Sequence, residues 1–128
     1  MGIIRLYEIC PEAEKEGIEN AVVTGVTDNT AEVKQGCIFV CIKGARFDGH
    51  SAAAEMLSKG AVMIVTDHDI KCGKQLVTDN TRLCLARLLN SFYGKPSEKL
   101  GLLAVTGTNG KTTTAHVVKH ILTTLGKK

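Results

Sequence analysis

Long apolar runs are missing from this sequence of 128 residues. None approaches the roughly 20 residues that an α-helix needs to cross a bilayer, so we predict no membrane partner. The first 17 residues include four glutamates and no long apolar core, and they do not resemble a secretory signal. We therefore expect a cytoplasmic protein.

Clusters of basic and aromatic side chains are also scarce. The net charge is +3, aromatic residues make up 4% of the chain, and the lysines are scattered along it. A nucleic-acid reader needs a basic patch with aromatic residues between the charges, so we predict no nucleic-acid partner. There is no internal repeat or low-complexity tract, and the 44% hydrophobic content suffices for the core of one ordinary domain.

No Cys-x-x-Cys pair occurs among the cysteines. Two of them, Cys37 and Cys41, fall on one predicted strand, where a rise of roughly 3.3 Å per residue places them about 13 Å apart. That separation is too large for a disulfide or a shared metal ion. We interpret all five cysteines as reduced thiols that mostly fill the core. They are Cys10, Cys37, Cys41, Cys72 and Cys84.

Three short apolar runs predict strands that are buried on both faces, at residues 37–42, 61–65 and 102–105. The runs are continuous rather than alternating, and glycine or polar residues bound them, which is typical of parallel strands packed between helices. Weaker strands are expected at residues 21–26 and 75–77.

Helices are predicted between these strands. The segment 51–60 has Ser51 as its N-cap, and the segment 80–96 has Asn80 as its N-cap and Pro96 as its terminator. A third helix is predicted at residues 110–126. The resulting fold class is α/β, with a mostly parallel sheet and flanking helices.

The segment GKPSEK at residues 94–99 is the best linker candidate, since Gly, Pro and Ser interrupt the pattern. Only one strand, one loop and one helix follow it, which is half of a βαβ unit. We therefore expect one domain at residues 1–97 and the truncated start of a second domain at residues 98–128. The last helix carries an apolar stripe, so we expect it to fold back on the first domain or to self-associate with another copy. The stripe consists of Val118, Ile121, Leu122 and Leu125.

The segment LLAVTGTNGKTTT predicts a phosphate-binding loop between a buried strand and a helix. Gly107 and Gly110 allow the backbone to turn and approach a ligand, and the amides at the helix N-terminus favour an anion. Lys111 would meet the β- and γ-phosphates of ATP, and the Thr112 hydroxyl would bind Mg²⁺. The loop is shorter than the strict G-x-x-x-x-G-K-[ST] pattern, which requires a glycine where Val105 stands. The alternative is a glycine-rich turn that caps an ordinary helix.

Several segments together resemble the Mur ligase family. VTGTNGKTTT at residues 105–114 is nearly identical to the ATP loop of that family. VKQGCIFVCIKGARFDGH at residues 33–50 resembles a stretch of its N-terminal domain, TDNT at 27–30 stands where Asp-Ser-Arg is common, and FYGKPS at 92–97 resembles its exit from the first domain. The resemblance covers the chain from residue 22 onward, in the expected order.

The resemblance implies an N-terminal domain that binds the UDP-sugar, followed by the first βα unit of a P-loop ATPase domain. The full enzyme would be an ATP-dependent ligase that joins an amino acid to UDP-N-acetylmuramoyl-L-alanyl-D-glutamate through an acyl phosphate, in peptidoglycan precursor synthesis. Lys111 and Thr112 would have the catalytic roles, Thr112 as a metal ligand, and this chain alone would be inactive. The ATP contacts would come from Gly107, Thr108, Asn109, Gly110, Lys111, Thr112 and Thr113.

The same resemblance assigns two loops to the UDP-sugar. Asn29 can pair with a uracil edge and Arg46 can reach a diphosphate. The loop at 27–30 departs from the family, because Asn29 replaces a serine and Thr30 replaces an arginine. Plain turns, of the Asx type at 27–30, are the alternative. The assigned residues are Thr27, Asn29, Ala45, Arg46 and Phe47, with Asp48, Gly49 and His50 shaping the turn.

The sequence is also compatible with other branches of the family and with a binding module. The triple threonine after Lys111 favours the branch that makes the UDP-N-acetylmuramoyl-tripeptide. The D-alanyl-D-alanine-adding branch, a cyanophycin synthetase-like ligase and a non-catalytic nucleotide-sugar-binding module are the alternatives. His116 and His120 have the i, i+4 spacing of a zinc site but no third ligand nearby, so we expect a solvated helix face. DHD at 67–69 is interpreted as a plain polar turn.

Overall fold

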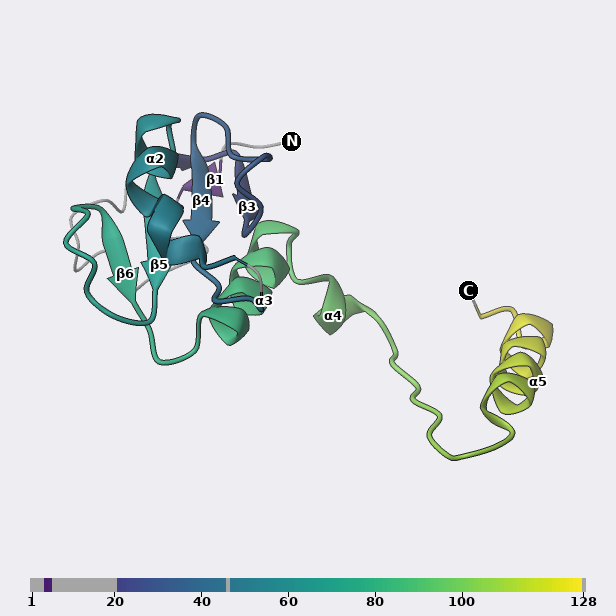
Figure 1. Ribbon diagram of the computed structural model, residues 1–128. Coiled ribbons are helices and arrows are strands. Elements are labelled where there is room, and N and C mark those ends of the chain that lie inside the picture. Colours follow the sequence, from purple (N-terminus) through teal and green to yellow (C-terminus); the bar gives the residue numbers. More distant parts are fainter. Residues whose placement is uncertain (1–3, 6–20, 46, 128) are drawn as a thin grey trace. The chain divides into compact units, whose positions relative to one another are not determined.

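The computed structural model describes residues 4–5, 21–45 and 47–127. The chain divides into two units, Met1–Glu98 and Lys99–Lys128 (Figure 1). Cys10 and Arg46 lie outside the described residues. No helix in the described ranges combines the length and the apolar character that crossing a bilayer requires.

A four-stranded parallel sheet forms the centre of the first unit. Its strands are β3 (Gly25–Thr27), β4 (Cys37–Val40), β5 (Met63–Thr66) and β6 (Gln75–Val77), and they lie side by side in chain order. A separate antiparallel pair joins β1 (Ile4–Arg5) to β2 (Val22–Val23). The predicted α/β class with a parallel sheet is confirmed, and strands form within four of the five predicted segments.

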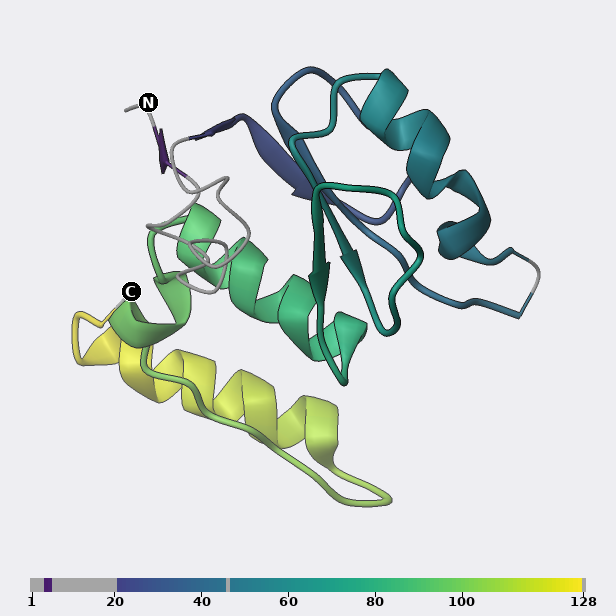
Figure 2. The ribbon, with the colours of Figure 1, turned by 90° about the vertical axis from the view of Figure 1, so that its left-hand side faces the viewer.

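Helices cover both faces of the sheet, which explains why the β4 and β5 sequences are continuously apolar. Successive side chains of a strand point to opposite faces. Ile38 and Val40 pack in a core with Leu88 and Phe92 of α3 (Thr81–Phe92). The second core occupies the other face, where α2 (Ala53–Ser58) packs (Figure 2). Its buried residues are Phe39, Cys41, Ala52, Ala53, Met56, Ala61 and Ile64.

The predicted N-cap of α3 is confirmed. Asn80 has an extended backbone, and its side-chain oxygen accepts a hydrogen bond from the Leu83 amide at 3.0 Å. Gly94, with φ of 72°, follows the helix. Pro96 then occupies the first position of a four-residue helix, α4 (Pro96–Lys99), where its missing N–H is no loss.

The predicted N-cap of the preceding helix is wrong. A 3₁₀ turn, η2 (Gly49–Ala52), comes before α2, and Asp48 caps it by accepting the His50 amide at 3.0 Å. The Ser51 hydroxyl instead donates to the Asp48 carbonyl at 2.7 Å. The Asp48 carboxylate is the stronger acceptor for the first free amides, so the helical segment starts earlier than expected.

The predicted strand at residues 102–105 is also wrong. In the second unit, residues 101–106 form no regular structure, and Leu102 and Leu103 are 81% and 66% exposed. A strand requires a neighbouring strand for its hydrogen bonds. The described part of this unit offers only the end of α4 and α5 (Lys111–Thr124), so the apolar run has no strand to pair with.

The described cysteines occupy core or half-buried positions. Cys37 and Cys41 are buried, and Cys72 and Cys84 are half-buried. This placement agrees with the interpretation as core filler.

Candidate functional site

Loops with polar side chains leave the carboxyl edge of the parallel sheet. The segment 28–36 follows β3, the segment 41–50 follows β4, and the segment 67–74 follows β5. Parallel strands place these loops at one edge, which is where ligands bind in open α/β sheets. The eight residues predicted to contact the UDP-sugar belong to the end of β3 and to the first two loops.

The loop after β3 is an Asx turn. The Asn29 side-chain oxygen accepts the Ala31 amide at 3.0 Å, and its amide nitrogen donates to Glu32 at 3.2 Å. Thr27 also donates to Glu32, at 3.0 Å. The polar groups of Thr27 and Asn29 are thus held within the loop, and a uracil would have to displace Glu32 to pair with the Asn29 amide.

The loop after β4 is a tight reversal that presents Phe47. Lys43 and Asp48 form an antiparallel bridge, and the Gly44 amide donates to the Phe47 carbonyl at 2.9 Å. Phe47 is 53% exposed, and Ala45, two residues earlier, is exposed as well. An exposed aromatic ring at the carboxyl edge of a sheet is a suitable surface for a nucleobase to stack on.

Gly49 fixes the return of this loop to the sheet. It is buried, and a Cβ at this position would lie 3.0 Å from the Ile42 nitrogen and 3.2 Å from the Cys41 Cα. The Gly49 amide donates to the Ile42 carbonyl at 3.1 Å. A side chain would push this segment off β4, which explains the glycine between Asp48 and His50.

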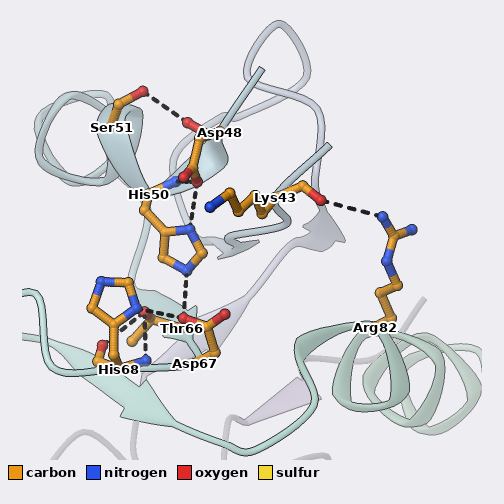
Figure 3. A network of polar contacts seen from close by, with 8 residues as sticks. All are labelled: Lys43, Asp48, His50, Ser51, Thr66, Asp67, His68 and Arg82. Atoms are coloured by element: carbon orange, nitrogen blue, oxygen red, sulfur yellow. Dashed lines mark hydrogen bonds and ion pairs between the residues drawn. The ribbon is translucent and has the colours of Figure 1, made fainter. Parts of the chain in front are cut away.

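A cluster of two aspartates and two histidines joins the loops after β4 and β5 (Figure 3). His50 Nδ1 lies 2.5 Å from Asp48 Oδ1, and His50 Nε2 lies 3.1 Å from Asp67 Oδ1. His68 Nδ1 lies 2.5 Å from the same Asp67 oxygen. The rings of His50 and His68 stack with their centroids 4.8 Å apart. We refer to Asp48, His50, Asp67 and His68 as the His–Asp cluster.

The carboxylates of the His–Asp cluster are held in their charged form. Hydrogen bonds from the His50 ring and then from the His50 amide lower the pKa of Asp48. A hydrogen bond from the His68 ring lowers the pKa of Asp67. Burial, followed by the charges of Cys72, Asp48 and Asp67, raises the pKa of the neighbouring Cys41 thiol to about 12. Both carboxylates therefore stay ionised at neutral pH, and Cys41 stays a protonated thiol.

The sequence interpretation of residues 67–69 as a plain polar turn misses this contact. Asp67 and His68 directly follow the buried strand β5, and Asp48 and His50 follow its neighbour β4. The position of both pairs after adjacent parallel strands is the signal that points to their meeting. On the other side of the loop, Arg82 of α3 reaches the Lys43 carbonyl at 3.5 Å.

The predicted phosphate loop lies at the N-terminus of α5 in the second unit. Gly107 and Gly110 have φ of 148° and 77°, conformations that favour glycine, and Gly110 is the N-cap. The Lys111 ammonium donates to the Gly107 and Thr108 carbonyls at 2.5 and 3.3 Å. The lysine thus lies across its own loop, where phosphate oxygens would replace these carbonyls.

A shallow depression runs beside the first two turns of α5. Its lining combines the Lys111 side chain and the Thr112 hydroxyl with the apolar segment before the loop. Residues 107–113, which we predict to contact ATP, are all exposed. The depression is lined by Leu103, Val105, Lys111, Thr112, Ala115, His116 and Lys119.

Comparison with known protein families gives one match. The model described as "Mur ligase family, catalytic domain" matches residues 22–106. The match therefore includes the four-stranded sheet, the three carboxyl-edge loops and the His–Asp cluster.

Two curated relatives illustrate the similarity. A UDP-N-acetylmuramoyl-L-alanyl-D-glutamate–2,6-diaminopimelate ligase of Aquifex aeolicus is 42% identical over 107 residues, which are 83% of this chain and 22% of that protein. The enzyme of the same name from Syntrophomonas wolfei is 38% identical over 131 residues, 100% of this chain and 27% of that protein. The chain spans about a quarter of the length of these relatives.

Solved structures with the same fold are also Mur ligases. MurF from Acinetobacter baumannii has a TM-score of 0.67 and 26% identity, over 98% of this chain and 28% of that chain. MurF ligase from Thermotoga maritima, solved in complex with ADP, has a TM-score of 0.53 and 32% identity, over 77% of this chain and 23% of that chain.

Proposed function

Because the chain belongs to the Mur ligase family, we propose that it supplies the UDP-sugar site and the ATP loop of an ATP-dependent amide-bond-forming ligase. The substrate is UDP-N-acetylmuramoyl-L-alanyl-D-glutamate, and the added amino acid is 2,6-diaminopimelate, as in the names of the curated relatives. Their names favour this branch over the D-alanyl-D-alanine-adding one. We infer from this proposed reaction that the protein acts in the cytoplasm, in peptidoglycan precursor synthesis.

The division of the chain supports two roles. We assign residues 1–97 to a UDP-sugar-binding domain and residues 98–128 to the start of an ATPase domain. The observation that carries the proposal is the Gly107–Lys111 loop at the head of α5, because its left-handed glycines and helix N-terminus suit a polyphosphate. The ADP complex of the Thermotoga maritima relative supports ATP as the nucleotide.

The proposed chemistry needs charge neutralisation. A substrate carboxylate attacks the γ-phosphate of ATP to give an acyl phosphate, and the amine of the amino acid then displaces phosphate. Lys111 offsets the charge that develops on the phosphate oxygens. Thr112 is exposed one residue into α5, so its hydroxyl suits a Mg²⁺ ligand. Mg²⁺ held there would supply positive charge that screens the phosphate oxygens.

We expect the 128-residue chain to bind the UDP-sugar and the Phe47→Ala variant to bind it more weakly. Stacking of a base on an aromatic ring contributes about 1–3 kcal/mol, so the affinity falls roughly tenfold or more. Isothermal titration calorimetry with UDP-N-acetylmuramoyl-L-alanyl-D-glutamate measures the change. Val22→Ala is the matched control. Val22 has a similar exposure, 47%, but belongs to β2, which is not part of the four-stranded sheet and its carboxyl-edge loops. Equal affinities for both variants would refute the placement of uridine on Phe47.

We also propose that the chain self-associates through α5. Its exposed apolar side chains include Ile121 and Leu125, at 51% and 67%, and the half-exposed Leu122 at 43%. Sedimentation equilibrium should show a concentration-dependent dimer for the chain and a monomer for the Ile121→Lys/Leu125→Lys double variant, because buried lysines oppose the contact. Lys119→Ala on the same helix serves as the control. A chain that is monomeric at every concentration contradicts this proposal.

A further inference from the structure

Three side chains of the His–Asp cluster bring potential metal-ligating atoms close together. His50 comes from the loop after β4, and Asp67 and His68 come from the loop after β5. One ligand atom from each residue lies within 4.8 Å of the other two. Two imidazoles and one carboxylate form a donor set that suits transition metals, whereas Mg²⁺ and Ca²⁺ prefer oxygen ligands only.

His50 is the central member, because its environment has one unexplained atom. Its side chain is only 9% exposed, and Nε2 is buried without a partner in hydrogen-bond geometry. Asp67 Oδ1 lies 3.1 Å from Nε2, within ion-pair distance. A buried ring nitrogen that faces a carboxylate at this distance is stabilised by a positive charge, which a bound cation can supply.

Asp48 favours a metal ion as that positive charge. Its carboxylate lies 2.5 Å from His50 Nδ1, so this nitrogen donates and Nε2 keeps its lone pair for a ligand. Metal-binding histidines commonly use such a carboxylate on their second nitrogen to fix the tautomer and the ring orientation.

The spacing of the donor atoms also suits one ion. Two atoms bound to the same Zn²⁺ at about 2.0–2.1 Å are roughly 2.9–3.4 Å apart for octahedral to tetrahedral angles. The separation of His50 Nε2 and Asp67 Oδ1 is 3.1 Å. The His68 side chain is 62% exposed, so its ring can turn a nitrogen toward the ion without disturbing the core.

We propose that His50, Asp67 and His68 bind one Zn²⁺ ion, with Asp48 orienting His50. The ion joins the loops after β4 and β5 and thereby fixes the base of the reversal that presents Phe47. The site uses no residue of the ATP loop and requires no substrate, while His50 and Asp48 also shape the loop that we assign to the UDP-sugar. Water completes the coordination on the exposed side of Asp67 and His68.

The test uses the full chain without an affinity tag. This background chain carries the substitutions His116→Asn and His120→Asn. These two histidines are spaced i, i+4 on α5 and would bind Zn²⁺ weakly themselves. Isothermal titration calorimetry with Zn²⁺ is expected to show one ion per chain. Co²⁺ in place of Zn²⁺ is expected to give the visible bands of nitrogen and oxygen ligation without a thiolate charge-transfer band.

Three single variants in this background identify the ligands. His68→Asn and Asp67→Asn are each expected to lower the Zn²⁺ affinity at least roughly tenfold, and Asp48→Asn about 10–100-fold, the usual effect of losing the carboxylate behind a ligating histidine. Asp69→Asn is the matched control. The Asp69 carboxylate accepts hydrogen bonds from the Gln75 side chain and the Lys71 amide, and it lies outside the cluster. Circular dichroism verifies that each variant is folded.

Absence of Zn²⁺ binding in the background chain would overturn the proposal. So would unchanged affinity in both His68→Asn and Asp67→Asn, or a thiolate band with Co²⁺. Loss of UDP-sugar binding with Zn²⁺ binding retained would count against the proposed function alone.

Discussion

Replacing Lys111 by alanine is expected to lower the ligase rate by about 10²–10³-fold, the range found when one preorganised group that stabilises transition-state charge is removed. The ammonium already lies over the loop, on the Gly107 and Thr108 carbonyls, and so needs little rearrangement to meet a phosphate. The experiment requires a complete enzyme. A suitable one is a chimera in which residues 22–128 replace the matching segment of the Aquifex aeolicus relative.

Steady-state kinetics of this chimera, measured as ADP release that depends on the amino acid, provide the readout. We expect kcat to fall more than the KM for ATP rises, because the charge that Lys111 offsets develops mainly in the transition state. Lys111→Arg should not restore the rate, since a planar guanidinium does not replace a compact ammonium. Lys127→Ala, beyond the end of α5, is the matched control. Near-normal turnover in Lys111→Ala would remove the lysine from the proposed mechanism.

Replacing Phe39 by alanine should destabilise the fold by about 3–5 kcal/mol, the usual cost of a large cavity at a buried aromatic position. Phe39 is fully buried in β4 and belongs to the core under α2. A typical domain has a free energy of unfolding of about 5–15 kcal/mol, so this loss is a large share of the total. Urea unfolding followed by circular dichroism measures it.

Phe47→Ala serves as the control for Phe39→Ala in the stability experiment, because it removes the same kind of side chain from an exposed position. Its side chain is 53% exposed in the loop after β4, and the expected change is within about 0.5 kcal/mol. The two phenylalanines thus separate stability from binding: Phe39 should affect unfolding, and Phe47 should affect UDP-sugar affinity. A Phe39→Ala variant as stable as Phe47→Ala would contradict the two-core description of the sheet.

The central strands can be predicted well from the sequence, because strands that are buried on both faces consist of consecutive apolar residues. Residues 38–40 and 63–65 are apolar without alternation, and both faces of these strands are covered. The Asn80 cap is equally local, since it depends on one side chain and an amide three residues later. Such features need no knowledge of distant parts of the chain.

The errors arise where a partner outside the segment decides the outcome. The run at 102–105 is as apolar as a buried strand, yet strand formation depends on a neighbouring strand, which the described part of its unit does not offer. Ser51 has a suitable hydroxyl, but the Asp48 carboxylate three residues earlier takes the cap. The contact of His50 with Asp67 depends on the pairing of β4 with β5, which periodicity alone does not give.

Because side chains alternate between the two faces of β4, insertions and deletions should be tolerated less within this strand than in the loops at its end. Ile38 and Phe39 are adjacent, yet they serve cores on opposite faces of the sheet. An inserted or deleted residue within the strand would exchange the two faces for every position after it, a disruption larger than that of any single substitution. At the carboxyl edge, the reversal at residues 43–48 can change length without shifting that frame. Natural variants of this protein should therefore differ in length at the loops of the carboxyl edge and keep a fixed residue count through β4 and β5.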